Sequence, residues 1–141
     1  MAITLDQARV VIRAALEKGR ELQLNPLSVV VLDAGGHVQA FEREDGAAPG
    51  RFQIAHGKAY ASVMLGAPSS VIGEMAIDRP HFGAALNHVY GGQVIPVPGG
   101  VLVKDGDGAV LGAVGVTGDT SENDAAAALA GIEAAGLSGV A

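Results

Sequence analysis

The chain has 141 residues, a net charge of −6 and no cysteine. This length fits one domain, and the lack of cysteine excludes disulfides, thiolate metal sites and a cysteine nucleophile. The chain has no basic patch interleaved with aromatic residues, which argues against nucleic-acid binding. It also has no apolar run near the roughly 18 residues of a membrane span. The first residues lack a basic segment followed by an apolar run, so we expect a cytoplasmic protein.

The composition is unusually apolar for a chain of this size. Hydrophobic residues make up 49% of the sequence and charged residues only 17%. Such a chain has little polar surface to cover itself with, and homo-oligomers bury apolar surface between subunits. We therefore expect a homo-oligomer of four or more chains. The alternative is a tightly packed alanine and valine core that needs no partner.

The N-terminal segment predicts an amphipathic helix. Thr4 and Gln7 have the spacing of a capping box, and apolar residues then recur at helical spacing from Leu5 to Leu22. Asn25 and Pro26 end this helix.

A hairpin and a second helix follow. Two apolar runs, 27–32 and 37–41, are joined by the Asp33–Gly36 turn, which is typical of a β-hairpin in which glycine takes a positive φ. Glycine and proline predict a loop over 43–50. The alanine-rich segment 52–65 has one apolar stripe and predicts a helix.

The middle of the chain has weaker patterns. Ser70 is a candidate cap for a short helix that ends near Ala76. Residues 77–92 show no clear period, although a helical turn over 82–89 is compatible with them. Residues 93–98 are expected to be extended, and their two prolines suit an edge strand or a loop.

The C-terminal part predicts a second hairpin and a last helix. The runs 101–104 and 109–117 flank the turn 105–108, and Ser121–Asp124 resembles an N-terminal cap for a helix over 122–135. No βαβ repeat, linker or internal repeat is present. We therefore predict one α+β domain over 1–141, with a five-stranded antiparallel sheet flanked by helices.

Histidines are the candidate metal ligands in a chain without cysteine. They stand at positions 37, 56, 81 and 88, and none has the spacing of a paired zinc motif. His81 and His88 are seven residues apart, about two helical turns, so they would not chelate one ion. Haem needs only one histidine, and the sequence leaves all four open. The simpler interpretation is four ordinary polar side chains.

Charged residues near apolar segments are the other candidates. Arg43 and Asp45 follow the first hairpin, and Lys58 lies beside the apolar stripe of the second helix. A lysine there extends to water or points into a pocket. Arg79 lies in the irregular segment, and such segments often line ligand sites. No serine lies in a nucleophile elbow.

The order of these motifs resembles the GlcG/HbpS family, also called haem-degrading-domain or PduO-C-like. The resemblance runs through Val29–Phe41, Arg43–Gly46 and Ile54–Ala61, and continues through 91–92, 98–100, 111–118 and the last helix. It implies a profilin-like fold with α/β/α layers and a homo-oligomer. It also implies a small ligand, with haem as the candidate cofactor and catabolic operons as the setting of some members.

Three functions follow from these features. The first is binding of haem or a related anionic ligand, with haem degradation as an added activity. The second is a small catabolic isomerase or tautomerase acting on an oxo-acid, and the third is a non-catalytic accessory oligomer. Whether the chain is an enzyme stays open. We predict no metal site, and candidate catalytic roles for Lys58, Arg43 and His81. Candidate ligand-binding roles go to Asp45, Arg79, Phe82, Asn87, Gly91 and Gly92. Because cations outnumber carboxylates in this set, we expect an anionic ligand.

Overall fold

A single five-stranded sheet forms the centre of the protein, whose computed structural model describes residues 2–141. The strands are β1 Ser28–Asp33, β2 Val38–Arg43, β3 Gly100–Lys104, β4 Val110–Thr117 and β5 Ser138–Val140. Their order across the sheet is β2-β1-β4-β3-β5, and every neighbouring pair is antiparallel. The α+β class and the five-stranded antiparallel sheet expected from the sequence are confirmed.

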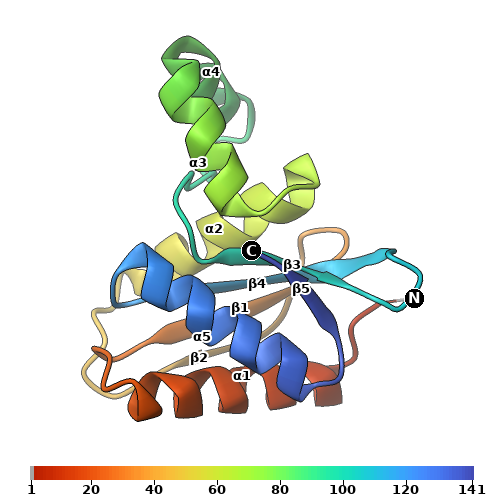
Figure 1. The fold of residues 1–141 in the computed structure, drawn as a ribbon. Helices are drawn as coiled ribbons and strands as arrows, with labels where there is room; N and C mark the ends of the chain where they lie inside the picture. The colour runs from red at the N-terminus through yellow and green to blue at the C-terminus, as the bar shows by residue number, and fades with distance from the viewer. Residues whose placement is uncertain (1) are drawn as a thin grey trace.

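Helices cover both faces of this sheet, which gives three layers (Figure 1). Helices α1 Leu5–Glu21 and α5 Ser121–Ala134 pack on one face, and α2 Arg51–Leu65 packs on the other. Strand β1 contributes to both cores, because Val29 and Val31 face α1 and α5 while Val30 and Leu32 face α2. Burial on both faces explains why β1 is one continuous apolar run.

Two further helices, α3 Ser69–Asp78 and α4 Pro80–Val89, form an arm that projects from the layered body (Figure 1). Ala61, Ile72 and Val94 make a small apolar cluster at its base. Ile77 is 80% exposed and Val89 is 71% exposed, so the arm carries apolar side chains in water. None of the helices in the described residues is long and apolar enough to cross a membrane.

Local sequence signals were accurate where a short motif carries its own hydrogen bonds. The capping box of α1 is complete, since the Thr4 side chain accepts from the Gln7 amide and the Gln7 side chain accepts from the Thr4 amide. Gly36 has φ +85°, as a tight hairpin turn requires. Helix α2 begins and ends within one residue of its predicted range.

Helix ends in the middle and C-terminal parts differ from the prediction. Helix α3 begins at Ser69, with Pro68 at the N-cap and no side-chain cap, so the expected cap at Ser70 is wrong. The cap of α5 is Thr120, one residue before the expected Ser121, and its hydroxyl accepts from the Asn123 amide. In both cases a neighbouring residue already has the extended backbone that a cap needs.

The fifth strand lies at 138–140, where the sequence predicted no strand. Residues 93–98 form a loop, one of the two alternatives expected for them, and Ser138–Val140 pairs with β3 as the edge strand. The sequence expected at most a turn over 82–89, and these residues belong to the longer helix α4, which begins at Pro80. Proline is favoured in the first turn of a helix, because its missing amide has no partner there.

Candidate functional site

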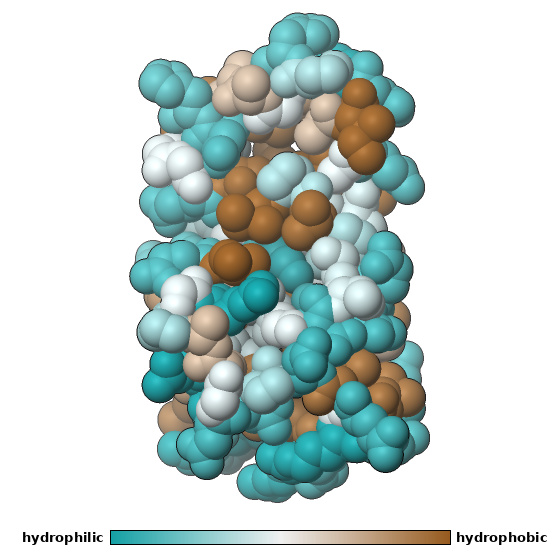
Figure 2. All heavy atoms as spheres, turned by 90° about the vertical axis from the view of Figure 1, so that its left-hand side faces the viewer, coloured by the Kyte–Doolittle hydropathy of each residue, from teal (hydrophilic) through white to brown (hydrophobic). Residues whose placement is uncertain are grey.

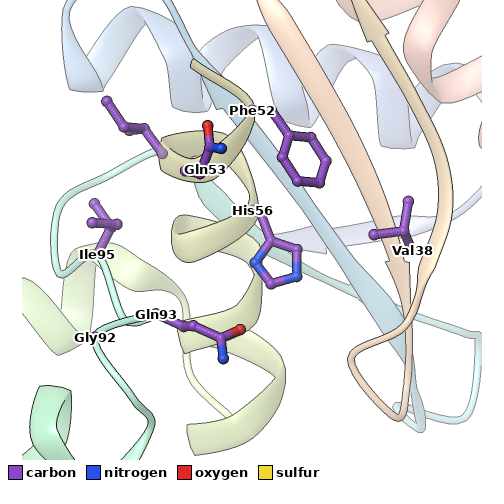
Figure 3. A pocket seen from close by; sticks show the side chains of 8 residues that line it. Val38, Phe52, Gln53, His56, Gly92, Gln93 and Ile95 are labelled. Atoms are coloured by element: carbon purple, nitrogen blue, oxygen red, sulfur yellow. The ribbon is translucent and has the colours of Figure 1, made fainter. Parts of the chain in front are cut away.

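An apolar pocket lies beside α2, on the side of the sheet opposite α1 and α5. Its volume is about 410 Å³. In Figure 3, His56 extends into the middle of the pocket, with Phe52 and Gln93 nearby and Val38 facing it from β2. The lining residues are Val38, Phe52, Gln53, Ile54, His56, Gly92, Gln93 and Ile95. Volume and lining both match the usual character of small-ligand sites, which are concave and mostly apolar.

His56 is the polar group at the centre of this pocket. It stands four residues after Phe52 and four before Tyr60, so all three side chains lie on one stripe of α2. The ring centroids are 5.8 Å apart for Phe52 and His56 and 5.4 Å apart for His56 and Tyr60. Burial lowers the pKa of His56 below its ordinary value of 6.5. The ring is therefore neutral near pH 7, the form in which imidazole binds a metal.

Close packing of a loop against α2 builds the opposite wall. A Cβ on Gly57 would meet the Gln93 carbonyl oxygen at 2.8 Å, so only glycine allows this approach. The Ile95 amide donates to the Gly57 carbonyl at 3.2 Å. These contacts hold Gln93 and Ile95 against Gly57, which is the residue that follows His56 on α2.

A second hollow adjoins the pocket at Gly92. It is lined by Ala84, Asn87, His88, Gly91 and Gly92. The Asn87 side-chain oxygen accepts from the Val94 amide at 3.1 Å, and Gly91 and Gly92 have φ values of +65° and +80°. The structure thus brings three predicted ligand-binding residues, Asn87, Gly91 and Gly92, to the rim of the His56 pocket.

Lys58 does not line the pocket but is buried inside the protein. Its side chain is 3% exposed, and its Nζ donates to the Val116 carbonyl and to Asp124 Oδ2, each at 3.0 Å. Burial lowers the pKa of Lys58, and the Asp124 carboxylate opposes that shift. The ammonium group therefore links α2 to α5 through β4, inside the protein.

The remaining predicted residues lie in two other places. Arg43 and Asp45 line a hollow beside α1, together with Arg20 and Glu42. On the arm, Arg79 lies 4.5 Å above the Phe82 ring and the neighbouring His81 is exposed. Within one chain the structure does not bring Arg43, Lys58 and Arg79 together, and among residues 2–141 no lysine or arginine lines the His56 pocket. Their roles as site residues stay predictions. Among residues 2–141, no group of three or more histidine or acidic side chains is placed to hold a metal ion.

The pocket residues on α2 were missed as a set by the sequence reasoning. His56 was one of four open histidines, and Phe52 was placed only in the apolar stripe. The spacing of Phe52, His56 and Tyr60 was the signal available, since aromatic rings four residues apart on a helix form one surface. The loop 92–95 and strand β2 complete the pocket. The sequence contains no pattern that predicts that these segments lie beside α2.

The fold and the pocket together define a small-ligand-binding class of α/β/α domain. The chain belongs to the family described as haem degrading protein HbpS-like, whose model matches residues 3–133. The family resemblance expected from the sequence is therefore confirmed. No curated protein matches the chain significantly.

Solved structures share this fold over nearly the whole chain. A structure of the PduOC:heme complex is 24% identical, with 100% of both chains covered and a TM-score of 0.88. ORFY of Klebsiella pneumoniae is 26% identical, with 95% of this chain and 90% of that chain covered and a TM-score of 0.85. HbpS is 28% identical, with 94% and 89% covered and a TM-score of 0.82. The first of these likenesses supports the fold alone, because its identity is low.

Proposed function

We propose that this protein binds haem, or a related flat ligand, in the pocket around His56, with the His56 imidazole facing the centre of the ligand. The observation that carries the proposal is a neutral histidine in the middle of an apolar pocket of about 410 Å³. The His56 ring lies between the rings of Phe52 and Tyr60, with centroid distances of 5.8 and 5.4 Å. One imidazole nitrogen is enough to hold haem iron.

The residues around His56 fit a flat apolar ring. Phe52, Val38 and Ile95 offer apolar walls, and Gln53 and Gln93 add amide groups at the edge. Since none of the described residues that line the pocket is a lysine or an arginine, the carboxylates of an anionic ligand would point to water or to the rim near His88. Bound haem would supply redox and oxygen chemistry. The protein would orient the ring and exclude water from one of its faces.

The family, which is described as haem degrading, supports the same ligand. A catabolic isomerase would use Lys58, Arg43 or His81 at its substrate. In one chain Lys58 is buried in an ion pair, and Arg43 and His81 are not among the residues that line the His56 pocket. Haem degradation would be a further activity of the same site.

Titration with haemin tests the proposal. Four variants replace His37, His56, His81 or His88 singly by Phe, which keeps an apolar ring and removes the nitrogens. We expect a Soret band with the wild type. We expect His56→Phe to raise the dissociation constant about tenfold or more, a loss of about 1.4 kcal/mol, and to shift the band. Circular dichroism checks that each variant is folded.

The four variants also separate the candidate histidines. Loss of the band in His81→Phe or His88→Phe, with His56→Phe unchanged, would overturn the assignment to His56. No saturable binding by the wild type would overturn the proposed function.

Haem degradation is a separate measurement on the haemin-loaded protein. It is followed as loss of the Soret band with a reductant and oxygen, with haemin alone as the control.

A further inference from the structure

A second candidate site lies on the other side of the sheet, between α1 and the edge strand β2. It is a polar hollow of about 260 Å³, lined by Arg9, Arg13, Leu16, Arg20 and Glu42. Three of the six arginines of the chain meet here, although the protein as a whole carries a net charge of −6. The hollow is distinct from the His56 pocket, because α1 and α2 cover opposite faces of the sheet (Figure 1).

The sequence of α1 places these arginines on one stripe. Arg9, Arg13, Leu16 and Arg20 follow one another at steps of four, three and four residues, which is the spacing of one helical face. Leu16 is 7% exposed and forms the apolar floor between them, while the three arginines are exposed. Glu42 faces the arginines from β2. It is paired in register with Val29 of β1, and the Val29 side chain packs on the α1 side of the sheet.

Arg9 and Arg13 are only weakly neutralised by carboxylates of the chain. The third arginine, Arg20, is 3.5 Å from Glu44. The Arg9 contact with Asp6 is 3.9 Å long between side chains that are 61% and 96% exposed, so water screens it. Across residues 2–141, no carboxylate lies within 4 Å of the Arg13 guanidinium. Arg9 and Arg13 stand one helical turn apart, with Leu16 below them.

We propose that this hollow binds a small phosphomonoester that carries a hydroxyl group near its phosphate. A guanidinium donates two parallel hydrogen bonds to a phosphate, and a tetrahedral phosphate has enough oxygens to accept from two arginines at once. A planar carboxylate has two oxygens and suits one guanidinium. Glu42 has no role in binding phosphate itself, since it repels the anion, but its carboxylate accepts a hydrogen bond from a hydroxyl group. The volume admits a molecule of a few carbon atoms.

Calorimetry with glycerol phosphate, inorganic phosphate and succinate tests the proposal on the complete chain. We expect saturable binding of glycerol phosphate, weaker binding of inorganic phosphate and the weakest binding of succinate. Arg13→Gln should weaken glycerol phosphate binding about tenfold, the scale of a lost hydrogen bond to a charged group. Lys18→Gln is the matched control, because it removes one positive charge from the same helix outside the hollow, where Lys18 pairs with Glu21.

Glu42→Gln tests the hydroxyl contact. We expect this variant to bind inorganic phosphate more tightly and to lose its preference for glycerol phosphate. Equal affinity in Arg13→Gln and Lys18→Gln would overturn the site, since binding would then follow overall charge. Tighter binding of succinate than of either phosphate would overturn the ligand class, and absence of saturable binding at millimolar concentrations would overturn both. Saturation of the protein with haemin is expected to leave glycerol phosphate affinity unchanged.

Discussion

The buried ion pair between Lys58 and Asp124 is expected to dominate the effect of single substitutions on stability. Lys58 and Asp124 side chains are 3% and 1% exposed, and their charged atoms are 3.0 Å apart. The second oxygen of Asp124 accepts from the Asp119 amide at 3.0 Å, so the carboxylate cannot turn away. Lys58→Met keeps the length of the side chain and leaves a buried carboxylate without its cation. Breaking a buried pair on one side costs about 3–5 kcal/mol.

That loss is a large part of the free energy of unfolding of a domain, which is about 5–15 kcal/mol. Urea unfolding followed by circular dichroism at neutral pH measures it. The double variant Lys58→Met with Asp124→Asn keeps an acceptor for Asp119 and removes both charges. We expect the double variant to lose less unfolding free energy than the two single variants lose in sum. The difference should be about 1–3 kcal/mol, as for residues in direct contact.

Lys18→Met is the matched control, because the Lys18–Glu21 pair lies on the surface. Surface changes of this kind stay within about 0.5 kcal/mol. The reasoning is refuted if Lys58→Met costs no more than Lys18→Met, or if the two single losses simply add in the double variant.

Three further expectations follow from particular features. Gly36→Val should cost more than about 1 kcal/mol, because a β-branched residue is strained at φ +85°; thermal melting equal to the wild type would contradict this. The exposed Ile77 and Val89 of the arm fit a homo-oligomer of four or more chains, and light scattering that gives 14.1 kDa at micromolar concentration would exclude it. In the folded protein the pKa of His56 lies below 6.5, its value in the unfolded chain. At a pH between the two pKa values the unfolded chain binds the proton and the folded protein does not, so the free energy of unfolding falls as the pH drops through this window. His56→Phe should remove that part of the pH dependence, and identical pH profiles for the two proteins would contradict it.

Apolar side chains gather in the middle of one face of the molecule, near the height where the arm meets the layered body (Figure 2). Apolar surface gathered in this way is typical of ligand and subunit contacts.

The sequence by itself determined the elements whose signals are local. The capping box at Thr4, the glycine turn at Gly36 and the continuous apolar strands β1, β3 and β4 depend on residues within a few positions of one another. Such motifs carry their own hydrogen bonds and backbone preferences, so they form in the same way wherever the chain folds. The family pattern added the layered arrangement, and the structure confirmed it.

Only the tertiary structure decided the partners of the functional side chains. Lys58 could have extended to water, entered a pocket or formed an ion pair, and the choice depended on Asp124, which is 66 residues further along the chain. His56 became the centre of a pocket because β2 and the loop at Gln93 pack around α2. Strand β5 has only three residues and exists through its pairing with β3. Burial, charge pairing and sheet edges arise from contacts between distant segments, and no local pattern records which segments will meet.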